Sequence, residues 1–222
     1  MESQFARMKL GTHRMSATNG QTLPDDVRIP LKQRFRIMPT VRPERLLGRM
    51  GCYISHLEAL RMAIDLEWEN VLIVEDDCTF LKGAERRNFT VPQDCDVFYL
   101  GGLFWRQKAE PTLQTGPWVH IDREYLKIAC CLCYGIMGKS TIRRIYTTLM
   151  ESRPATIDMM YVNVIQKKGH CYILNPVLCS QDHSFESDVS SIGGPPPKYV
   201  KKTNAYYYRG VASGGCTPLR RC

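Results

Sequence analysis

The sequence predicts an α/β domain with a mixed, mainly parallel central sheet flanked by helices. Apolar runs typical of strands alternate along the chain with segments of helical periodicity, which is the pattern of an α/β layered fold. The chain has 222 residues, of which 44% are hydrophobic and 23% charged. This composition favours one globular domain over a disordered or a membrane-embedded chain. We expect that domain at residues 1–192, followed by a basic tail with Gly, Pro and Tyr at residues 193–222.

The first clear helix is predicted around residues 53–68. Its apolar side chains recur at steps of four and three, as on one face of a helix. Ser55, followed three residues later by Glu58, fits a capping box and predicts that the helix begins there. The residues of the apolar face are Tyr53, Leu57, Leu60, Ile64 and Trp68.

Three apolar runs predict strands. Residues 71–74 form a short run rich in β-branched side chains, typical of a central parallel strand buried on both faces. Residues 96–100 form a second strand that ends at two glycines. Residues 128–137 form a third.

The second half of the chain continues the alternation. Ser140 is predicted to cap a helix, and residues 158–168 predict another that Gly169 ends. Residues 171–174 then predict a short strand that ends before Pro176. The buried face of the helix after Ser140 is expected to comprise Ile142, Ile145, Tyr146 and Leu149.

The formal net charge of +8 is concentrated in two segments. The tail at residues 193–222 holds six basic residues and no acidic one, and residues 28–49 hold seven basic residues and a single acidic one, Glu44. Either segment could attract a phosphate-bearing partner, or it could simply be a solvated basic face. Composition alone leaves both interpretations open.

No membrane span or signal peptide is predicted. The longest nearly uncharged apolar stretch, around residues 128–138, is too short to cross a bilayer, and the first residues do not combine a basic and an apolar region. We therefore expect a soluble cytoplasmic protein with reduced thiols, with peripheral attachment to a membrane as the alternative. A pair between Cys216 and Cys222 would apply in an oxidising compartment.

The most informative residues are the carboxylates Glu75, Asp76 and Asp77, which directly follow the strand at 71–74. Three adjacent carboxylates repel one another, so a divalent cation such as Mn²⁺ or Mg²⁺ is the obvious partner, and it could hold a diphosphate. The alternative is a solvated acidic turn. A response-regulator receiver domain carries a similar string, but the next strand here ends without the carboxylate that such a domain needs.

The surrounding motifs resemble glycosyltransferase family 25. Gly-Cys-x-x-Ser-His at residues 51–56, an amphipathic helix, and the apolar run ending in Glu-Asp-Asp at residues 71–77 occur in the order and spacing of that family. Residues 96–101 resemble its next strand, and residues 134–137 with Asp158 resemble its acceptor-side half. The resemblance covers about residues 5–192 and implies a GT-A-like, Rossmann-type fold.

One departure from the family concerns the start of the chain. The family opens with a strand and an Asn-Leu-x-x-Arg-x-x-Arg stretch that cradles the nucleotide. Residues 5–20 resemble the segment that comes directly after this stretch. We therefore expect the first strand of the family to be missing before Met1, which would weaken nucleotide binding.

The resemblance implies roles for the donor side. Asp77 would coordinate the metal, and Glu75 and Asp76 would contact the metal or the ribose. Ser55 and His56 are expected at a helix N-terminus that faces the donor diphosphate, where free N–H groups favour anions. For Ser55, helix capping alone is an equally good explanation.

The resemblance to GT-A enzymes implies roles for two further residues, one on the acceptor side and one at the metal. Asp158, at the start of a predicted helix, would be the base that takes the proton from the acceptor hydroxyl, or else an ordinary helix cap. His183 would be a late metal ligand, or else a solvated loop histidine.

Taken together, the motifs and the resemblance imply a metal-dependent hexosyltransferase, and the resemblance alone implies that it is inverting. It would transfer a sugar, galactose by resemblance, from a UDP-sugar to a hydroxyl of a glycan, glycolipid or glycoprotein, as in lipopolysaccharide biosynthesis. The alternative is a non-catalytic relative of such enzymes or a basic module that binds nucleic acid, to which the tyrosines of the tail lend support.

Overall fold

The structure is a computed structural model of the whole chain. It describes residues 2–8, 10–36, 45–102, 104–106, 116–121, 126–128 and 132–182. His183, the domain end expected at residue 192 and the basic tail lie outside the described residues.

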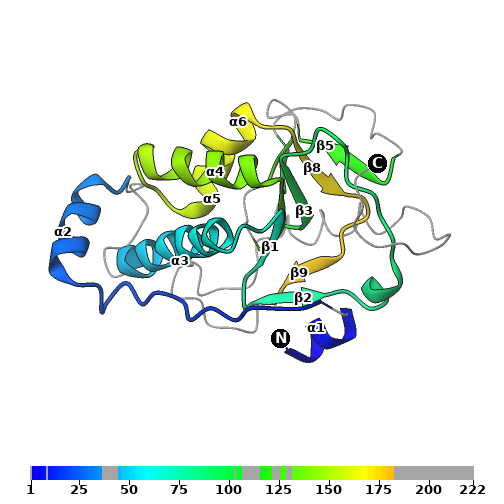
Figure 1. Cartoon of the computed structure of the whole chain (residues 1–222), viewed down its shortest axis with the longest axis horizontal. Helices are drawn as coiled ribbons and strands as arrows, with labels where there is room; N and C mark the ends of the chain where they lie inside the picture. Colours follow the sequence, from blue (N-terminus) through cyan, green and yellow to red (C-terminus); the bar gives the residue numbers. More distant parts are fainter. Residues whose placement is uncertain are drawn as a thin grey trace.

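A five-stranded sheet in the order β1-β7-β3-β8-β5 forms the centre of the molecule (Figure 1). Only β3 and β8 pair in parallel, whereas the other three pairs are antiparallel. The prediction of a mainly parallel sheet is therefore wrong, although the sheet is mixed and the fold is α/β. The strands are β1 (Asn70–Val74), β3 (Val97–Gly101), β5 (Trp118–His120), β7 (Cys133–Met137) and β8 (Cys171–Leu174).

The strand predicted at residues 71–74 is confirmed as β1, but its position differs from the prediction. Among the described residues β1 lies at the edge of the sheet, and it pairs only with the antiparallel β7. Only Val71 of this strand is fully buried, and the other apolar side chains are half-buried. A short apolar run does not reveal how many neighbours a strand has, so periodicity could not separate an edge from a central strand.

The run at residues 128–137 contains two strands instead of one. The two-stranded sheets are β4 (Phe104–Arg106) with β6 (Leu126–Ile128), and β2 (Cys78–Phe80) with β9 (Cys179–Gln181). The end of the predicted run thus belongs to β7 in the central sheet, and its beginning to β6 in a separate sheet. The β2–β9 pair contributes to the candidate site, because Gln181 of β9 donates a hydrogen bond to Asp77.

The long helix α3 (Leu46–Asp65) begins nine residues before the predicted start. Its apolar face is confirmed for Tyr53, Leu57 and Leu60, which are buried, whereas Ile64 is half-buried and Trp68 lies beyond the end of the helix. Ser55 lies in the middle of the helix, where its hydroxyl donates to the Gly51 carbonyl at 2.9 Å. The prediction of a capping box, and of a helix N-terminus at Ser55 and His56, is therefore wrong.

The helices of the second half agree well with the sequence. α4 (Lys139–Glu151) buries Ile142, Ile145 and Leu149 as predicted, but Tyr146 is only half-buried and the N-cap is Gly138 rather than Ser140. The predicted helix at residues 158–168 is a continuous helical stretch that ends at Gly169. It consists of α5 (Ile157–Met160), the π-helical η3 (Tyr161–Ile165) and α6 (Gln166–Lys168).

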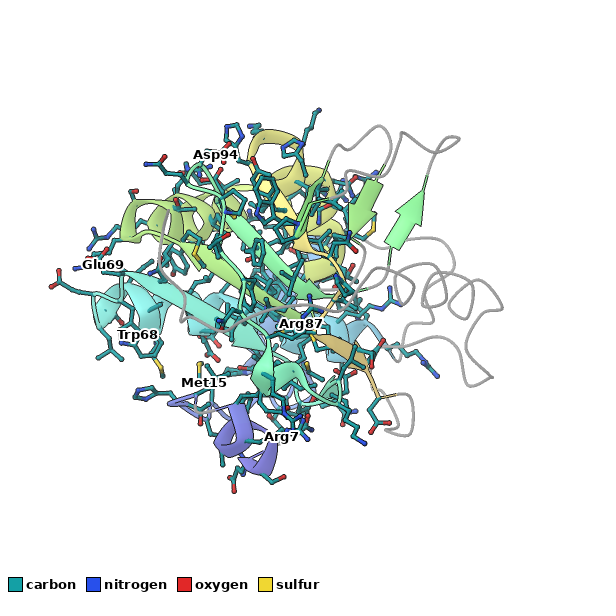
Figure 2. The ribbon with its side chains drawn as sticks, turned by 90° about the vertical axis from the view of Figure 1, so that its right-hand side faces the viewer. Arg7, Met15, Trp68, Glu69, Arg87 and Asp94 are labelled. Atoms are coloured by element: carbon teal, nitrogen blue, oxygen red, sulfur yellow. The ribbon has the colours of Figure 1, made fainter. Side chains whose placement is uncertain are left out.

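Three shorter helices lie outside the central layers. They are α1 (Glu2–Met8), α2 (Asp25–Arg34) and η2 (Ala84–Arg86). α1 packs on β2, where Gln4 accepts a hydrogen bond from the Phe80 N–H at 2.8 Å and Arg7 donates to the Phe80 carbonyl at 3.3 Å. Figure 2 shows Arg7 at one end of the molecule and Asp94 at the other.

Two hydrophobic clusters cover the two faces of the central sheet. Val97 and Tyr99 of β3 belong to the first cluster, together with α3, α4 and the helical stretch at 157–165. Phe98 and Leu100 of the same strand belong to the second cluster, together with residues of β2 and β9. Alternate side chains of one strand thus contribute to two cores, as the pleat of a strand requires. Within the described ranges, no helix has the length and apolar character needed to cross a membrane.

Candidate active site at the end of strand β1

The candidate site is assembled where β1 ends beside the middle of α3. Cys52 and His56 are one helical turn apart, so they lie on one face of α3. Glu75 follows β1 directly, and its N–H is bonded to the Leu132 carbonyl at 2.9 Å. The turn after β1 closes with a bond from the Cys78 N–H to the Glu75 carbonyl at 3.1 Å.

His56 connects the helix to the acidic turn. Its Nε2 lies 3.1 Å from Glu75 Oε1, and its Nδ1 lies 2.7 Å from the Tyr134 hydroxyl. A carboxylate only accepts hydrogen bonds, so Nε2 carries the proton in the neutral ring and the Tyr134 hydroxyl donates to Nδ1. With only 5% of its surface exposed, His56 is fixed on both sides.

Asp77 is held by the β2–β9 pair. Its Oδ2 accepts a hydrogen bond from Gln181 Nε2 at 2.7 Å, and its backbone carbonyl accepts from the Asp182 N–H, also at 2.7 Å. Its other carboxylate oxygen, Oδ1, is buried and has no hydrogen-bond partner among the residues that the structure describes. Burial raises the pKa of Asp77, and the charges of Glu75 and Asp76 raise it further, although the bond from Gln181 opposes the shift.

The thiol of Cys52 is affected electrostatically by all four predicted carboxylates. Burial of this thiol raises its pKa, and Glu75, Asp158, Asp77 and Asp76 raise it further in that order. The thiol is therefore protonated at neutral pH. The same negative field is what would attract a cation.

Asp158 lies near this region from a different element. It occupies the first turn of α5, as predicted, after the N-cap Thr156. Its charge acts on Cys52 and on Arg49, whose pKa burial lowers and Asp158 raises. The structure thus brings Asp158 into the electrostatic environment of the acidic turn.

Ser55 and Asp76 have a weaker connection to the cluster. Ser55 Oγ accepts a hydrogen bond from the Thr18 N–H at 2.8 Å, so this hydroxyl fixes a loop against α3. The Asp76 side chain is exposed beside Glu75 and Asp77. Ser55 therefore has a structural explanation in its backbone contacts, whereas Asp76 remains available to a ligand from solution.

Three residues of the site were not predicted as such: Cys52, Tyr134 and Gln181. Cys52 and Tyr134 belong to motifs that the sequence shows, and the step of four from Cys52 to His56 could have indicated a shared helix face. No sequence signal could have identified Tyr134 and Gln181 as partners, because their contacts span 78 and 104 residues of chain. His183, two residues after Gln181, lies outside the described residues.

The oxygens and nitrogens present fit a divalent cation. Within the described part of the chain, Asp77 Oδ1 is a buried carboxylate oxygen without a hydrogen-bond partner, which is costly without a positive charge beside it. The donor atoms of Cys52, His56 and Glu75 lie within 4.8 Å of one another, and Asp77 is not part of this group among the described residues. Asp77 and Glu75 supply the hard oxygens that Mn²⁺ and Mg²⁺ prefer.

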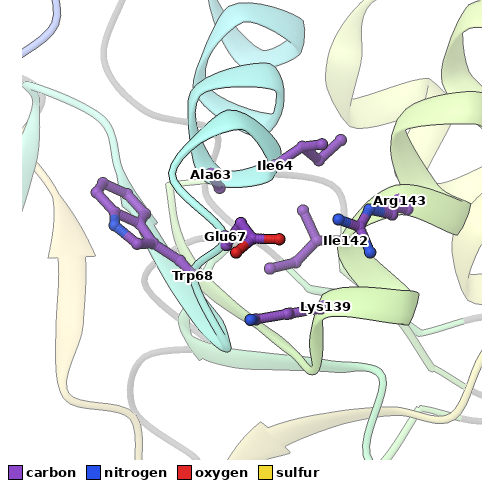
Figure 3. A pocket seen from close by; sticks show the side chains of 7 residues that line it. All are labelled: Ala63, Ile64, Glu67, Trp68, Lys139, Ile142 and Arg143. Atoms are coloured by element: carbon purple, nitrogen blue, oxygen red, sulfur yellow. The ribbon is translucent and has the colours of Figure 1, made fainter.

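A small hollow lies at the opposite end of β1 and is separate from this site (Figure 3). It is lined by the end of α3 and the start of α4, with Trp68, Lys139 and Arg143 around it. Lys139 there forms an ion pair with Glu69 at 3.3 Å, just before β1 begins. The carboxylates follow the other end of the strand, so this hollow does not belong to their chemistry.

Comparison with known proteins agrees with the motifs. Residues 1–107 match the family model described as "Glycosyltransferase family 25 (LPS biosynthesis protein)". No curated protein sequence matches the chain significantly. The matched region contains α3, β1 and the acidic turn, which are the parts that carry Cys52, His56 and Asp77. The match supports the assignment of residues 1–107 to glycosyltransferase family 25.

Proposed function

We propose that the protein is a metal-dependent, inverting hexosyltransferase that uses a UDP-sugar, with UDP-galactose as the first donor to test. The observation that carries this proposal is Asp77, whose buried Oδ1 has no hydrogen-bond partner among the described residues and which follows Glu75 and Asp76 directly in the chain. The match of residues 1–107 to the model of glycosyltransferase family 25 supports glycosyltransferase activity. The mainly antiparallel sheet adds no independent support for the GT-A-like fold that the resemblance implies, so the fold remains part of the proposal.

The donor side would be formed by the acidic turn and α3. Asp77 and Glu75 would hold Mn²⁺ or Mg²⁺, with His183 as a further predicted ligand, and the cation would neutralise charge on the departing UDP. Asp76, which is exposed, would contact the ribose. His56 would orient Glu75 through their contact at 3.1 Å.

The acceptor side would be served by Asp158. The acceptor hydroxyl oxygen forms a bond to the anomeric carbon while the bond from that carbon to the diphosphate oxygen breaks. The hydroxyl proton passes to the Asp158 carboxylate, and UDP leaves as the anion. The acceptor would be a glycan, a glycolipid or a glycoprotein, as the family description of lipopolysaccharide biosynthesis suggests.

The test is a calorimetric titration of UDP into the full chain, with and without Mn²⁺. We expect binding that depends on Mn²⁺ and that Asp77→Ala weakens by about tenfold or more, because one charged ligand is lost. The control is Asp26→Ala, which removes an exposed carboxylate on α2.

Metal-dependent binding that disappears only in Asp77→Ala supports the donor site and justifies a screen of sugar donors. A folded wild-type chain that binds no UDP contradicts the proposal and favours a non-catalytic relative. Equal UDP binding by the wild type and Asp77→Ala would also contradict it. Circular dichroism establishes in each case that the variant is folded.

A further inference from the structure

Three buried cysteines meet in the second hydrophobic cluster, apart from the candidate active site. They are Cys78 of β2, Cys133 of β7 and Cys179 of β9, and their sulfur atoms lie within 4.8 Å of one another. None of the three is more than 1% exposed. None forms a disulfide in the described part of the chain.

The strand registers explain why the three thiols converge. In the β2–β9 pair, Cys179 lies opposite Phe80. Phe80 is two residues after Cys78 in β2, so the two side chains project from the same face of the strand. Cys78 and Cys179 therefore project from one face of the pair. Cys133 pairs with Gly101 of β3 in the central sheet. A side chain on Gly101 would place its Cβ 2.6 Å from the Cys179 sulfur, so this glycine leaves the space in which Cys179 reaches the other two.

The chemistry of the group points to a thiophilic cation. Three thiols supply three soft donors, which select Cu⁺ or Zn²⁺ over the hard cations of the acidic turn. Among the described residues no fourth His, Cys, Asp or Glu joins the group. Structural Zn²⁺ sites in proteins almost always have four protein ligands, and the burial of these three cysteines disfavours a water as the fourth. Cu⁺ accepts three sulfur ligands.

We propose that Cys78, Cys133 and Cys179 form a three-coordinate thiolate site for a thiophilic d¹⁰ cation, with Cu⁺ as the preferred ion. The metal would be structural and would fasten the β2–β9 pair to the central sheet. Each thiol that binds exchanges its proton for a metal–sulfur bond and releases the proton to the buffer, and the ion keeps its oxidation state. The proposal does not depend on sugar transfer.

The site would nevertheless influence the acidic turn through the chain. Cys78 directly follows Asp77, and Cys179 lies two residues before Gln181, which binds Asp77 at 2.7 Å. Cys133 precedes Tyr134, the partner of His56. Fixing the three sulfurs would therefore fix the backbone beside three residues of the candidate site.

The first experiment titrates the reduced full chain with Cu⁺ under anaerobic conditions, against a chromogenic Cu⁺ chelator. We expect one tightly bound Cu⁺ per chain in the wild type. Cys179→Ala should bind it at least tenfold more weakly, and a parallel titration with Zn²⁺ should give weaker binding than Cu⁺. The matched control is Cys171→Ala, because Cys171 is equally buried but faces the other core cluster from β8.

A second measurement uses only the wild type, in case Cys179→Ala does not fold. Cysteine alkylation in mild denaturant is mapped by mass spectrometry with and without Cu⁺. Protection of Cys78, Cys133 and Cys179, but not of Cys171, supports the site. Equal alkylation of all four, or a Cys179→Ala variant with wild-type affinity, overturns it. Tighter binding of Zn²⁺ than of Cu⁺ overturns the assignment of a three-coordinate ion.

Discussion

At Asp77, two effects compete at a single carboxylate. Burial and the adjacent charges of Glu75 and Asp76 disfavour its ionised form, whereas the hydrogen bond from Gln181 favours it. The net result is a raised pKa, so the folded chain holds this proton more tightly than the unfolded chain does. Ionised Asp77 is thus a local source of instability that a bound cation would relieve.

This imbalance predicts how stability depends on pH. Protonated Asp77 stabilises the folded state. This contribution to the free energy of unfolding is complete below the ordinary aspartate pKa, and it is lost as the pH rises through the raised pKa of Asp77 in the folded chain. Asp77→Asn removes the charge and keeps an amide oxygen for Gln181. We expect it to raise the metal-free melting temperature by about 2 °C near pH 7, with the gain vanishing toward pH ~4. Thermal melts at both pH values test this, with Asp26→Asn as the control. A wild type that is more stable than Asp77→Asn near pH 7 would contradict it.

Asp158 allows the two halves of the proposed reaction to be separated. Asp158→Asn leaves the side chain in place at the start of α5 but cannot accept a proton. We expect the rate of sugar transfer to fall by about 100-fold or more, as for loss of a general base. UDP binding in the presence of Mn²⁺ should stay unchanged. A transfer assay and the UDP titration measure the two effects, and a variant with full transfer rate would remove Asp158 from the mechanism.

At the level of residues, the sequence predicted the charged groups better than their partners. Glu75 and Asp77 are recognisable because adjacent carboxylates after a strand need an explanation. The roles of Tyr134 and Gln181 depend on contacts across the fold, and a single sequence does not encode those distances in its local pattern. At Ser55 the local pattern was misleading. Its hydroxyl fits a capping pattern in the sequence, but in the structure it accepts a hydrogen bond from the Thr18 N–H.

At the scale of elements, α3 has two neighbouring stripes of residues on its surface: one packs against another segment of the chain, and the other faces the acidic turn. Gly51 and Ser55 lie one turn apart and contact the segment at residues 18–20, whereas Cys52 and His56 lie one turn apart and face the carboxylates. The Gly-Cys-x-x-Ser-His motif thus combines a packing stripe with a chemical stripe. A helix period of 3.6 residues places the two stripes side by side.

The packing stripe is testable through Gly51. A Cβ at this position would lie 2.3 Å from the Thr18 carbonyl oxygen and 2.8 Å from the Gly20 nitrogen, so the segment would have to move. We expect Gly51→Ala to lower the free energy of unfolding by about 1–3 kcal/mol, despite the better helix propensity of alanine. Chemical denaturation measures this change. Gly11→Ala is the control because open space surrounds Gly11, and equal stability of the two variants would refute the packing role.

The elements were predicted well by type and less well by their boundaries and neighbours. α4 and the helical stretch at 157–168 follow their apolar periods, and Gly169 ends the second as expected. The start of α3 was misplaced because glycines at 48 and 51 lower helix propensity, while the contact at Gly51 makes glycine necessary there. Strand directions were wrong because an apolar run has no direction, and only the pairing of β7 with β1 and β3 reveals it.

At the scale of the whole molecule, the central sheet joins the two hydrophobic clusters into one structure. In β8, Cys171 and Ile173 belong to the first cluster, whereas Tyr172 and Leu174 belong to the second. The candidate site depends on both clusters. Its helix α3 packs in the first, and the β2–β9 pair that holds Asp77 packs in the second. Loss of either core should therefore disturb the whole described fold.

Two truncations, one in each cluster, test this cooperativity. Leu149 of α4 is fully buried in the first cluster, and Leu174 of β8 is 1% exposed in the second. Each change to alanine should lower the free energy of unfolding by about 2–5 kcal/mol. Because β3, β7 and β8 contribute to both clusters, far-ultraviolet and near-ultraviolet circular dichroism should give coincident melting curves in both variants. A Leu174→Ala chain that loses its near-ultraviolet signal while the helices stay folded would show that the clusters unfold separately. The β2–β9 pair would then be a detachable part of the donor site.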